Sequence, residues 1–231
     1  MVAFMEEAFT PRVYFANTLA HTDLEAGREL GLMIRQDHAS ESAILLLYDS
    51  VRSVEPRQLH VAGAIVQGLQ EALETHASIT GAGVLTDLAL TDGWMVLNGA
   101  VRRHVAAALV FPPNVTAEAI VLHACRPISA FMTITGIEGA EIFTLDGRRA
   151  LDVIEERLDM PLISETGHPS RIMTLGLKLG EQWVSGGPAD YMNRLILTAN
   201  RQTGSITLFE PDFFEGALVQ LMQNDPEMMV E

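Results

Sequence analysis

The stretch SAILLLYDS, residues 42–50, is a short continuous run of apolar side chains that ends in tyrosine, aspartate and serine. Such a run is typical of a strand that is buried on both faces, as the strands of parallel sheets are. We expect the polar residues to emerge at the carboxyl end of this strand. The stretch therefore predicts a strand that is buried on both faces.

Helical patterns lie on both sides of this strand. Residues 12–18 predict an earlier strand, and residues 23–37 predict a helix for which Thr22 and Asp23 are both candidate N-caps. After this strand, Pro56 suits the first position of a long helix with one apolar stripe. The order strand, helix, strand, helix predicts an α/β arrangement for this part of the chain.

The pattern then changes to strands and tight turns. A predicted strand over residues 77–87 contains Gly81 and Gly83, and the Asn98-Gly99 pair between two apolar runs predicts a β-hairpin. The two strand glycines are not followed by a helix whose N-terminus would face a pyrophosphate, so they do not indicate a dinucleotide site. They fit better as a wall against which a small ligand lies.

The Pro-Pro-Asn sequence at residues 112–114 predicts a boundary between two subdomains, residues 1–114 and residues 115–231. The second subdomain reads as mostly antiparallel strands with one clear helix over residues 148–159. The expected fold class is therefore α/β to α+β, with mixed and antiparallel sheets covered by helices.

The composition is that of a globular, acidic chain. Of the 231 residues, 48% are hydrophobic, and the formal net charge is -15. This charge repels phosphate backbones and anionic membranes, so we expect neither nucleic acid nor a membrane as partner. No apolar stretch is long enough for a membrane helix, and residues 1–12 lack the basic start of a signal peptide. A cytoplasmic location is the resulting expectation.

A histidine, the only cysteine and an arginine lie close together at residues 123–126. His123 and Cys125 share one face of a predicted strand, which permits the start of a metal site, although a structural role for both is the simpler interpretation. Same-face neighbours on a strand are too far apart for the histidine to activate the thiol. Arg126, before Pro127, is positioned to bind a carboxylate of a ligand or of the protein.

The stretch VLHACRPISAFMTITGIEGAEIFTLDGRRALDVIEERL, residues 121–158, resembles the junction between the two halves of FIST domains. Arg148 and Arg149 replace the usual proline-containing linker of that family. The resemblance extends over about residues 40–225 and rests on the order of several short motifs. The matching junction positions are Thr133, Thr135, Leu145, Asp146, Gly147, Ala150 and Leu151.

The first part of the family's amino-terminal region and its last helix and strand have no counterpart in this resemblance. We therefore expect a shortened or partial member, with residues 1–114 as the FIST N-like half and residues 115–231 as the FIST C-like half. A strand missing from the sheet would leave an exposed edge, which favours a homodimer.

The resemblance implies an intracellular sensory module for signal transduction, without enzymatic activity or a cofactor, that binds amino acids or small carboxylates. It also implies a histidine kinase or another signalling protein as partner. We expect Arg126 to hold the ligand carboxylate. The residues predicted to border the ligand are Arg126, Pro127, Gly81, Gly83, Thr86 and Thr133.

Three other functions remain open at this point. A subset of similar proteins senses nitric oxide through haem, for which His123 would be the iron ligand beside an apolar pocket from Ile128, Phe131 and Met132. The second open function is that of a protein-interaction adaptor without a small ligand. A hydrolase or transferase that uses Cys125 or a serine is the third, although no spacing of residues nominates a catalytic triad.

Overall fold

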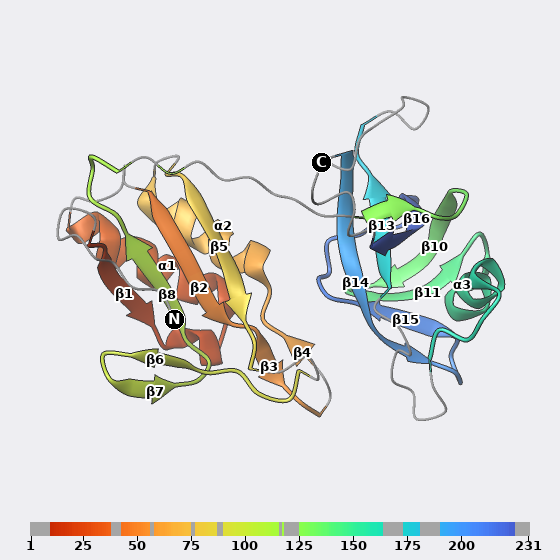
Figure 1. The fold of residues 1–231 in the computed structure, drawn as a ribbon, viewed down its shortest axis with the longest axis horizontal. Helices are drawn as coiled ribbons and strands as arrows, with labels where there is room; N and C mark the ends of the chain where they lie inside the picture. Colours follow the sequence, from red (N-terminus) through yellow and green to blue (C-terminus); the bar gives the residue numbers. More distant parts are fainter. Residues whose placement is uncertain are drawn as a thin grey trace. The chain divides into compact units, whose positions relative to one another are not determined.

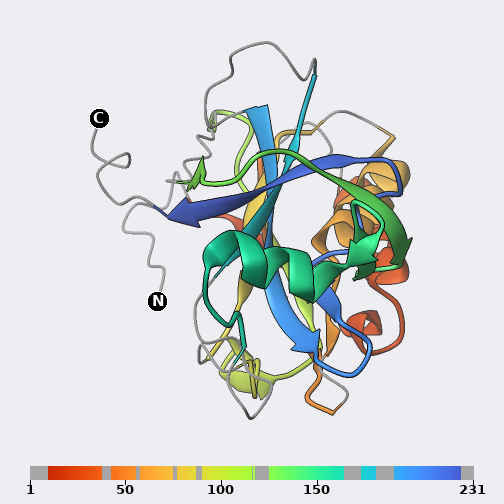
Figure 2. The same cartoon turned by 90° about the vertical axis from the view of Figure 1, so that its right-hand side faces the viewer.

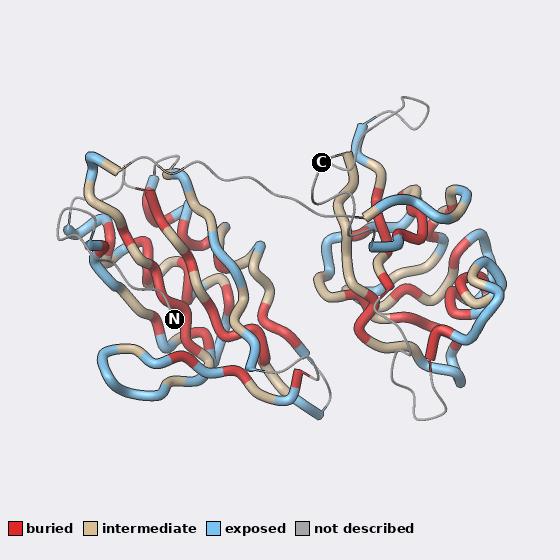
Figure 3. Tube along the Cα trace, viewed as in Figure 1, coloured by how far each residue is buried: buried red, intermediate tan, exposed pale blue. Residues whose placement is uncertain are grey.

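The chain separates into two compact units, which we call unit 1 (Met1–Ala119) and unit 2 (Ile120–Glu231) (Figure 1). Each unit has a buried core of its own (Figure 3). In this computed structural model the described residues are 10–37, 43–55, 58–74, 77–86, 90–115, 117, 125–163, 173–180 and 190–224. Among these residues, no helix is long and apolar enough to cross a membrane.

Unit 1 is built on a mixed four-stranded sheet with the order β1-β8-β2-β5. The strands are β1 (Arg12–Ala16), β8 (Ala106–Val110), β2 (Ile44–Asp49) and β5 (Ile79–Val84). β8 pairs antiparallel with both β1 and β2, whereas β2 and β5 are parallel, with Ile44 opposite Ile79. The residues that predict a buried strand form β2, which lies between β8 and β5. The mixed sheet confirms the predicted fold class.

Two helices, α1 (Asp23–Gln36) and α2 (Ala62–Leu73), cover one face of this sheet (Figure 1). Their buried stripes pack on alternate residues of the strands, as the period of two requires. Thr22 is the N-cap of α1, because its Oγ1 accepts a hydrogen bond of 3.1 Å from the Glu25 N–H. Asp23 is therefore the first helical residue and its carboxylate is available for other contacts.

The helices approach each other closely through glycines. A Cβ on Gly27 would lie 2.0 Å from the Ile65 carbonyl oxygen, and one on Gly68 would lie 2.0 Å from the Leu24 carbonyl oxygen. Because neither position leaves room for a side chain, the two helices form a tight layer on the sheet.

The opposite face of the sheet is partly covered by a hairpin of β6 (Met95–Leu97) and β7 (Ala100–Arg102). Its turn is formed by Asn98 and Gly99 with φ angles of 52° and 77°. Two consecutive positive φ angles are what the favoured two-residue hairpin turn requires, so the predicted Asn-Gly hairpin is confirmed.

The second helix begins later than the sequence predicts. β3 (Val51–Ser53) pairs antiparallel with β4 (Gln58–Leu59), and α2 starts only at Ala62. The predicted first residue, Pro56, lies outside the described residues. Two long-range hydrogen bonds anchor the chain just before the helix: the His60 N–H donates to the Ser50 carbonyl (2.9 Å), and the Val61 N–H donates to the Asp23 carboxylate (3.0 Å).

Unit 2 is a closed antiparallel barrel. Its six strands follow the order β10-β11-β15-β14-β13-β16, and β16 pairs back onto β10. Closure removes the free edges and encloses an apolar core. The strands are β10 (Met132–Glu138), β11 (Glu141–Leu145), β15 (Ser205–Leu208), β14 (Tyr191–Asn200), β13 (Thr174–Lys178) and β16 (Leu218–Asn224).

Three shorter elements complete this unit. β9 (Cys125–Pro127) pairs with the end of β16, and β12 (Arg148–Arg149) pairs with β11. α3 (Ala150–Leu158) lies against the barrel strands and buries Leu151 and Ile154 in their core (Figure 2). Among the described residues of unit 2, every strand pairing is antiparallel and α3 is the one helix.

Candidate functional site

Buried polar side chains gather at the carboxyl end of β2 in unit 1. Asp49, Ser50, His60 and Asp23 are each no more than 8% exposed. Burying polar and charged groups costs free energy unless they are paired, so their concentration at one place needs a structural or functional reason. In open α/β sheets, ligands bind outside the carboxyl ends of the strands, which makes this end of the sheet the candidate site.

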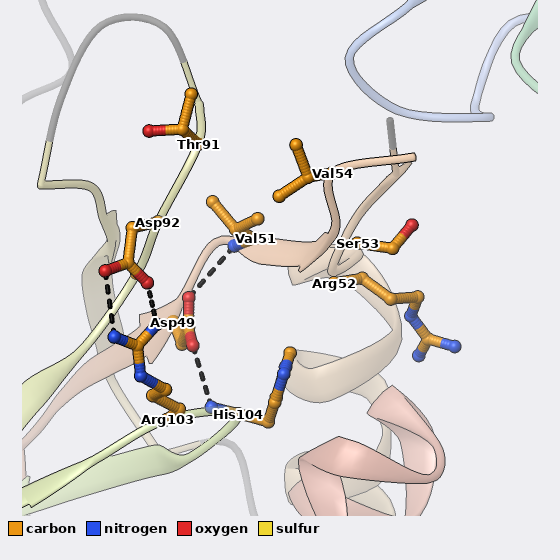
Figure 4. Close-up of a pocket in the computed structure, with 10 residues that line it drawn as sticks. Asp49, Val51, Arg52, Ser53, Val54, Thr91, Asp92, Arg103 and His104 are labelled. Atoms are coloured by element: carbon orange, nitrogen blue, oxygen red, sulfur yellow. Dashed lines mark hydrogen bonds and ion pairs between the residues drawn. The ribbon is translucent and has the colours of Figure 1, made fainter. Parts of the chain in front are cut away.

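Asp49, the last residue of β2, holds two neighbouring segments with its carboxylate. Oδ1 accepts a hydrogen bond from the Val51 N–H (3.0 Å) and Oδ2 accepts one from the His104 N–H (2.7 Å). A Cβ on Gly93 would lie only 1.8 Å from Oδ1, so a third segment approaches the carboxylate where only glycine fits. Asp49 thus organises the rim of the site (Figure 4).

Asp23 accepts three hydrogen bonds although it lies at the start of α1. Oδ1 accepts from His60 Nδ1 (2.6 Å) and from Arg52 Nη2 (2.9 Å), and Oδ2 accepts from the Val61 N–H (3.0 Å). Burial alone would raise the pKa of this carboxyl, but the bonds from His60, Val61 and Arg52 together lower the pKa below its ordinary value. Asp23 is therefore a buried carboxylate that stays ionised.

His60 connects Asp23 to His104. The His60 side chain is fully buried, and its Nε2 lies 3.3 Å from His104 Nδ1. Because Asp23 is an acceptor, His60 Nδ1 must carry a proton, and in the neutral ring Nε2 is then an acceptor. With His60 neutral, this network places the Nδ1 proton on His104 and leaves the lone pair of His104 Nε2 outside the network.

A pocket of about 160 Å³ opens above these residues (Figure 4). Arg103 pairs with Asp92 through two contacts, one of which joins Nη2 and Oδ2 at 2.9 Å, and the Arg52 side chain is 34% exposed. Both signs of charge therefore meet in one small cavity, which suits a small polar ligand. The lining residues are Asp49, Val51, Arg52, Ser53, Val54, Thr91, Asp92, Gly93, Arg103 and His104.

The predicted ligand residues of unit 1 lie on β5, which pairs with β2, or just after it. A Cβ on Gly81 would lie 1.9 Å from the Leu46 carbonyl oxygen and one on Gly83 would lie 2.1 Å from Ser50 Oγ, so both glycines allow close packing against neighbouring residues. Thr86 touches the wall of the pocket, because its Oγ1 donates to the Asp92 carbonyl (2.7 Å).

The other predicted ligand residues belong to unit 2. Arg126 and Pro127 are exposed on β9, opposite the end of β16. Thr133 lies on β10, where its N–H donates to the Asp146 carboxylate (2.8 Å). The structure groups these three residues around β16 and its neighbour β10, and assigns Gly81, Gly83 and Thr86 to a different unit. Their role in ligand binding stays a prediction.

The remaining predicted chemistry concerns His123 and Cys125. His123, the expected haem ligand, lies outside the described residues. Burial raises the pKa of the Cys125 thiol, which disfavours the reactive thiolate. Within the described ranges, no group of three or more His, Cys, Asp or Glu side chains could hold a metal ion.

Asp23, Arg52, His60 and His104 were not identified from the sequence as functional residues. They stand at positions 23, 52, 60 and 104 and form no recognisable spacing. One signal did point to the region: the Tyr-Asp-Ser ending of the apolar strand, which marks its carboxyl end and contains Asp49.

Curated relatives match only part of this chain. Uncharacterized proteins from two strains of Mycobacterium tuberculosis are each 31% identical over 113 residues, which is 49% of this chain and 29% of the relative. An uncharacterized protein of Mycobacterium bovis is 30% identical over 98 residues, which is 42% of this chain and 25% of that protein. The matches thus span less than a third of the relatives' length. No solved structure matches.

A family model gives a broader match. The FIST N domain model matches residues 1–148, which include all of unit 1 and continue through β9, β10 and β11 of unit 2. Because this match covers more than half of the 231 residues, the chain belongs to the FIST domain family, a family of sensory and signal-transduction domains.

Proposed function

We propose that this chain is a sensory module that binds a small carboxylate or an amino acid in the pocket at the carboxyl end of β2. The supporting observation is the chain of contacts from buried Asp23 through His60 to His104, which ends in the pocket. A structural ion pair alone would not require a second histidine that leads from the buried carboxylate to an open cavity.

The size and charge of the pocket support this class of ligand. Its volume of about 160 Å³ is below the roughly 300–1,000 Å³ of sites for drug-sized molecules. Arg52 uses Nη2 for Asp23, and its guanidinium has five N–H donors, so others can bind a ligand carboxylate. Asp49 and Asp92, which also line the pocket, provide acceptors for an ammonium group.

We further propose that ligand binding is transmitted to a signalling protein such as a histidine kinase. Membership of a sensory family supports this step. The expected homodimer and the cytoplasmic location stay predictions.

The experiment compares two arginines. The complete chain is titrated calorimetrically with the standard amino acids and with acetate, succinate and citrate, and the same titrations are repeated with Arg52→Gln and Arg126→Gln. Loss of a charged hydrogen bond costs about 1.5–3 kcal/mol, so Arg52→Gln should weaken binding of the best ligand by about 10- to 150-fold. Arg126→Gln should bind as the unchanged chain does.

The opposite result would overturn the proposed position of the site. If Arg126→Gln loses the ligand and Arg52→Gln retains it, the site lies at β9 in unit 2, as the sequence pattern predicts. If no compound of the panel binds or raises the melting temperature, the proposed ligand class is wrong. Urea unfolding of both variants provides the control for folding.

A further inference from the structure

We propose that His104 is the ligand-contacting base of the pocket and takes up one proton when a carboxylate binds, and that Asp23 acts through His60 as a positioning residue for this step. The proposal rests on the proposed function, because it concerns the same pocket. It adds a chemical requirement: the pocket binds an anion together with a proton.

The hydrogen-bond pattern leads to this requirement. His60 Nδ1 donates to Asp23 (2.6 Å), so neutral His60 accepts from His104 Nδ1 across 3.3 Å, and His104 Nε2 keeps its lone pair. A carboxylate oxygen is also an acceptor, so it cannot form a hydrogen bond with this nitrogen. One proton from solvent converts His104 to imidazolium, whose Nε2–H then donates a charge-assisted hydrogen bond to the carboxylate.

Charged groups lie around His104 on several elements. From β2, the Asp49 carboxylate accepts the His104 backbone N–H, and from α1, Asp23 acts through His60. Arg52 of β3 lines the same cavity, and Arg103 beside it is paired with Asp92. Three carboxylates thus face two guanidiniums, which leaves one excess negative charge that a protonated His104 neutralises.

The backbone of His104 provides a suitable test variant. Its φ angle is 47°, in the left-handed region that asparagine also tolerates. His104→Asn therefore removes the titrating ring and retains a residue that can adopt this conformation. The matched control is His21→Asn, which removes an exposed imidazole next to the 3-10 turn at residues 18–20.

The first measurement needs no ligand. Long-range ¹⁵N–¹H correlation spectra of the complete chain at pH 8 report which ring nitrogen of each histidine carries the proton, and His104→Asn and His60→Gln assign the signals. We expect the Nδ1–H tautomer for both His60 and His104. An Nε2–H tautomer at His104 would overturn the inference, whether or not any ligand binds.

The second measurement uses acetate as the probe. Calorimetric titration at pH 8 in buffers with different heats of ionisation should show uptake of about one proton per acetate. Because the protonated form binds, acetate affinity should fall as pH rises, by at most about tenfold per pH unit. His104→Asn should lose both the uptake and the pH dependence, and His21→Asn should retain both.

A further variant separates positioning from packing. Asp23→Asn keeps the shape of the side chain and removes its charge, so the pH at which acetate affinity falls should shift to lower values. A merely structural Asp23 would weaken acetate binding equally at every pH. Acetate binding without proton uptake would overturn the inference and leave the proposed function standing. No binding of acetate or of any panel ligand at any pH would overturn both.

Discussion

Unit 1 gathers buried charged and polar side chains at one place, whereas the large core cluster of unit 2 is apolar. In unit 1, Asp23, Asp49 and His60 are at least 92% buried at one end of an open sheet. In unit 2, the closed barrel encloses aliphatic side chains such as Ile134 and Leu221, which are fully buried. Apolar side chains are held by packing, whereas buried charges are held only while every partner stays in place.

This difference supports the proposed position of the site in unit 1. A barrel filled by its own side chains is a stable support, and its strands have no free edge within the closed ring. The polar end of the sheet in unit 1 has a cavity beside buried charges, an arrangement that stability alone does not require. The comparison predicts that substitutions in the two units differ in both size and pH dependence.

The largest effect is expected in the barrel. Leu221→Ala removes a fully buried side chain in β16 and should lower the free energy of unfolding by about 2–5 kcal/mol, through lost burial and a new cavity. Urea unfolding followed by circular dichroism measures the loss, and hydrogen exchange locates it. Ile128→Ala, at a side chain that is 41% exposed, is the control with a much smaller change. If both variants lost the same free energy of unfolding, the burial of Leu221 in the barrel core would be contradicted.

A comparable effect is expected at the polar end of unit 1, for a different reason. Asp49→Ala leaves the N–H groups of Val51 and His104 without their acceptor. At roughly 1–3 kcal/mol for each buried donor the loss is at most about 6 kcal/mol, and we expect about 2–4 kcal/mol because the His104 N–H is only part-buried. Asp49→Asn retains one oxygen and should lose less. The measurement is again urea unfolding at pH 7. If Asp49→Asn is as unstable as Asp49→Ala, the loss of the two hydrogen bonds does not explain the lower free energy of unfolding.

A smaller effect is expected between the helices of unit 1. Gly27→Ala places a Cβ 2.0 Å from the Ile65 carbonyl oxygen, so α1 must move away from α2 at a cost of about 1–3 kcal/mol. Gly63→Ala is the matched variant, because its Cβ meets no atom within 4 Å. The better helix propensity of alanine should stabilise that variant by up to about 1 kcal/mol. Thermal unfolding of both should therefore show shifts of opposite sign.

The smallest effect should appear only in acid. The pKa of Asp23 in the folded chain is lower than its ordinary value of 3.8, so its ionised form stabilises the fold above that value. This stabilisation is lost as pH falls through the folded pKa. Asp23→Asn lacks the titrating group, so its stability should change less than that of the unchanged chain between about pH 5 and pH 2. Urea unfolding at several pH values tests this, and parallel curves would contradict it.

Much of the fold could be predicted from local patterns. The apolar run before Tyr48 became β2, the Asn98-Gly99 pair became a hairpin turn, and the periodic residues from Asp23 onward became α1. Each of these features depends only on residues that are close in the chain. The turn geometry and the spacing of apolar side chains can therefore be read from a short stretch of sequence.

The candidate site could not be predicted in the same way. Asp23, His60 and His104 come from the start of a helix, the segment before the next helix and the turn before β8. The sequence drew attention instead to Arg126, which lies in the other unit. These residues come together only when the helices pack on the sheet. Their positions in the sequence therefore form no motif that could be recognised beforehand.

The amino-acid sequence by itself therefore determined the fold class, the order of strands and helices and the resemblance to FIST domains, because each is carried by short-range patterns of apolar and turn-forming residues. Tertiary structure alone decided the late start of α2, the closure of the barrel between β10 and β16, and the meeting of Asp23 with His60 and His104. Each of these depends on hydrogen bonds between residues far apart in the chain, which exist only in the folded protein.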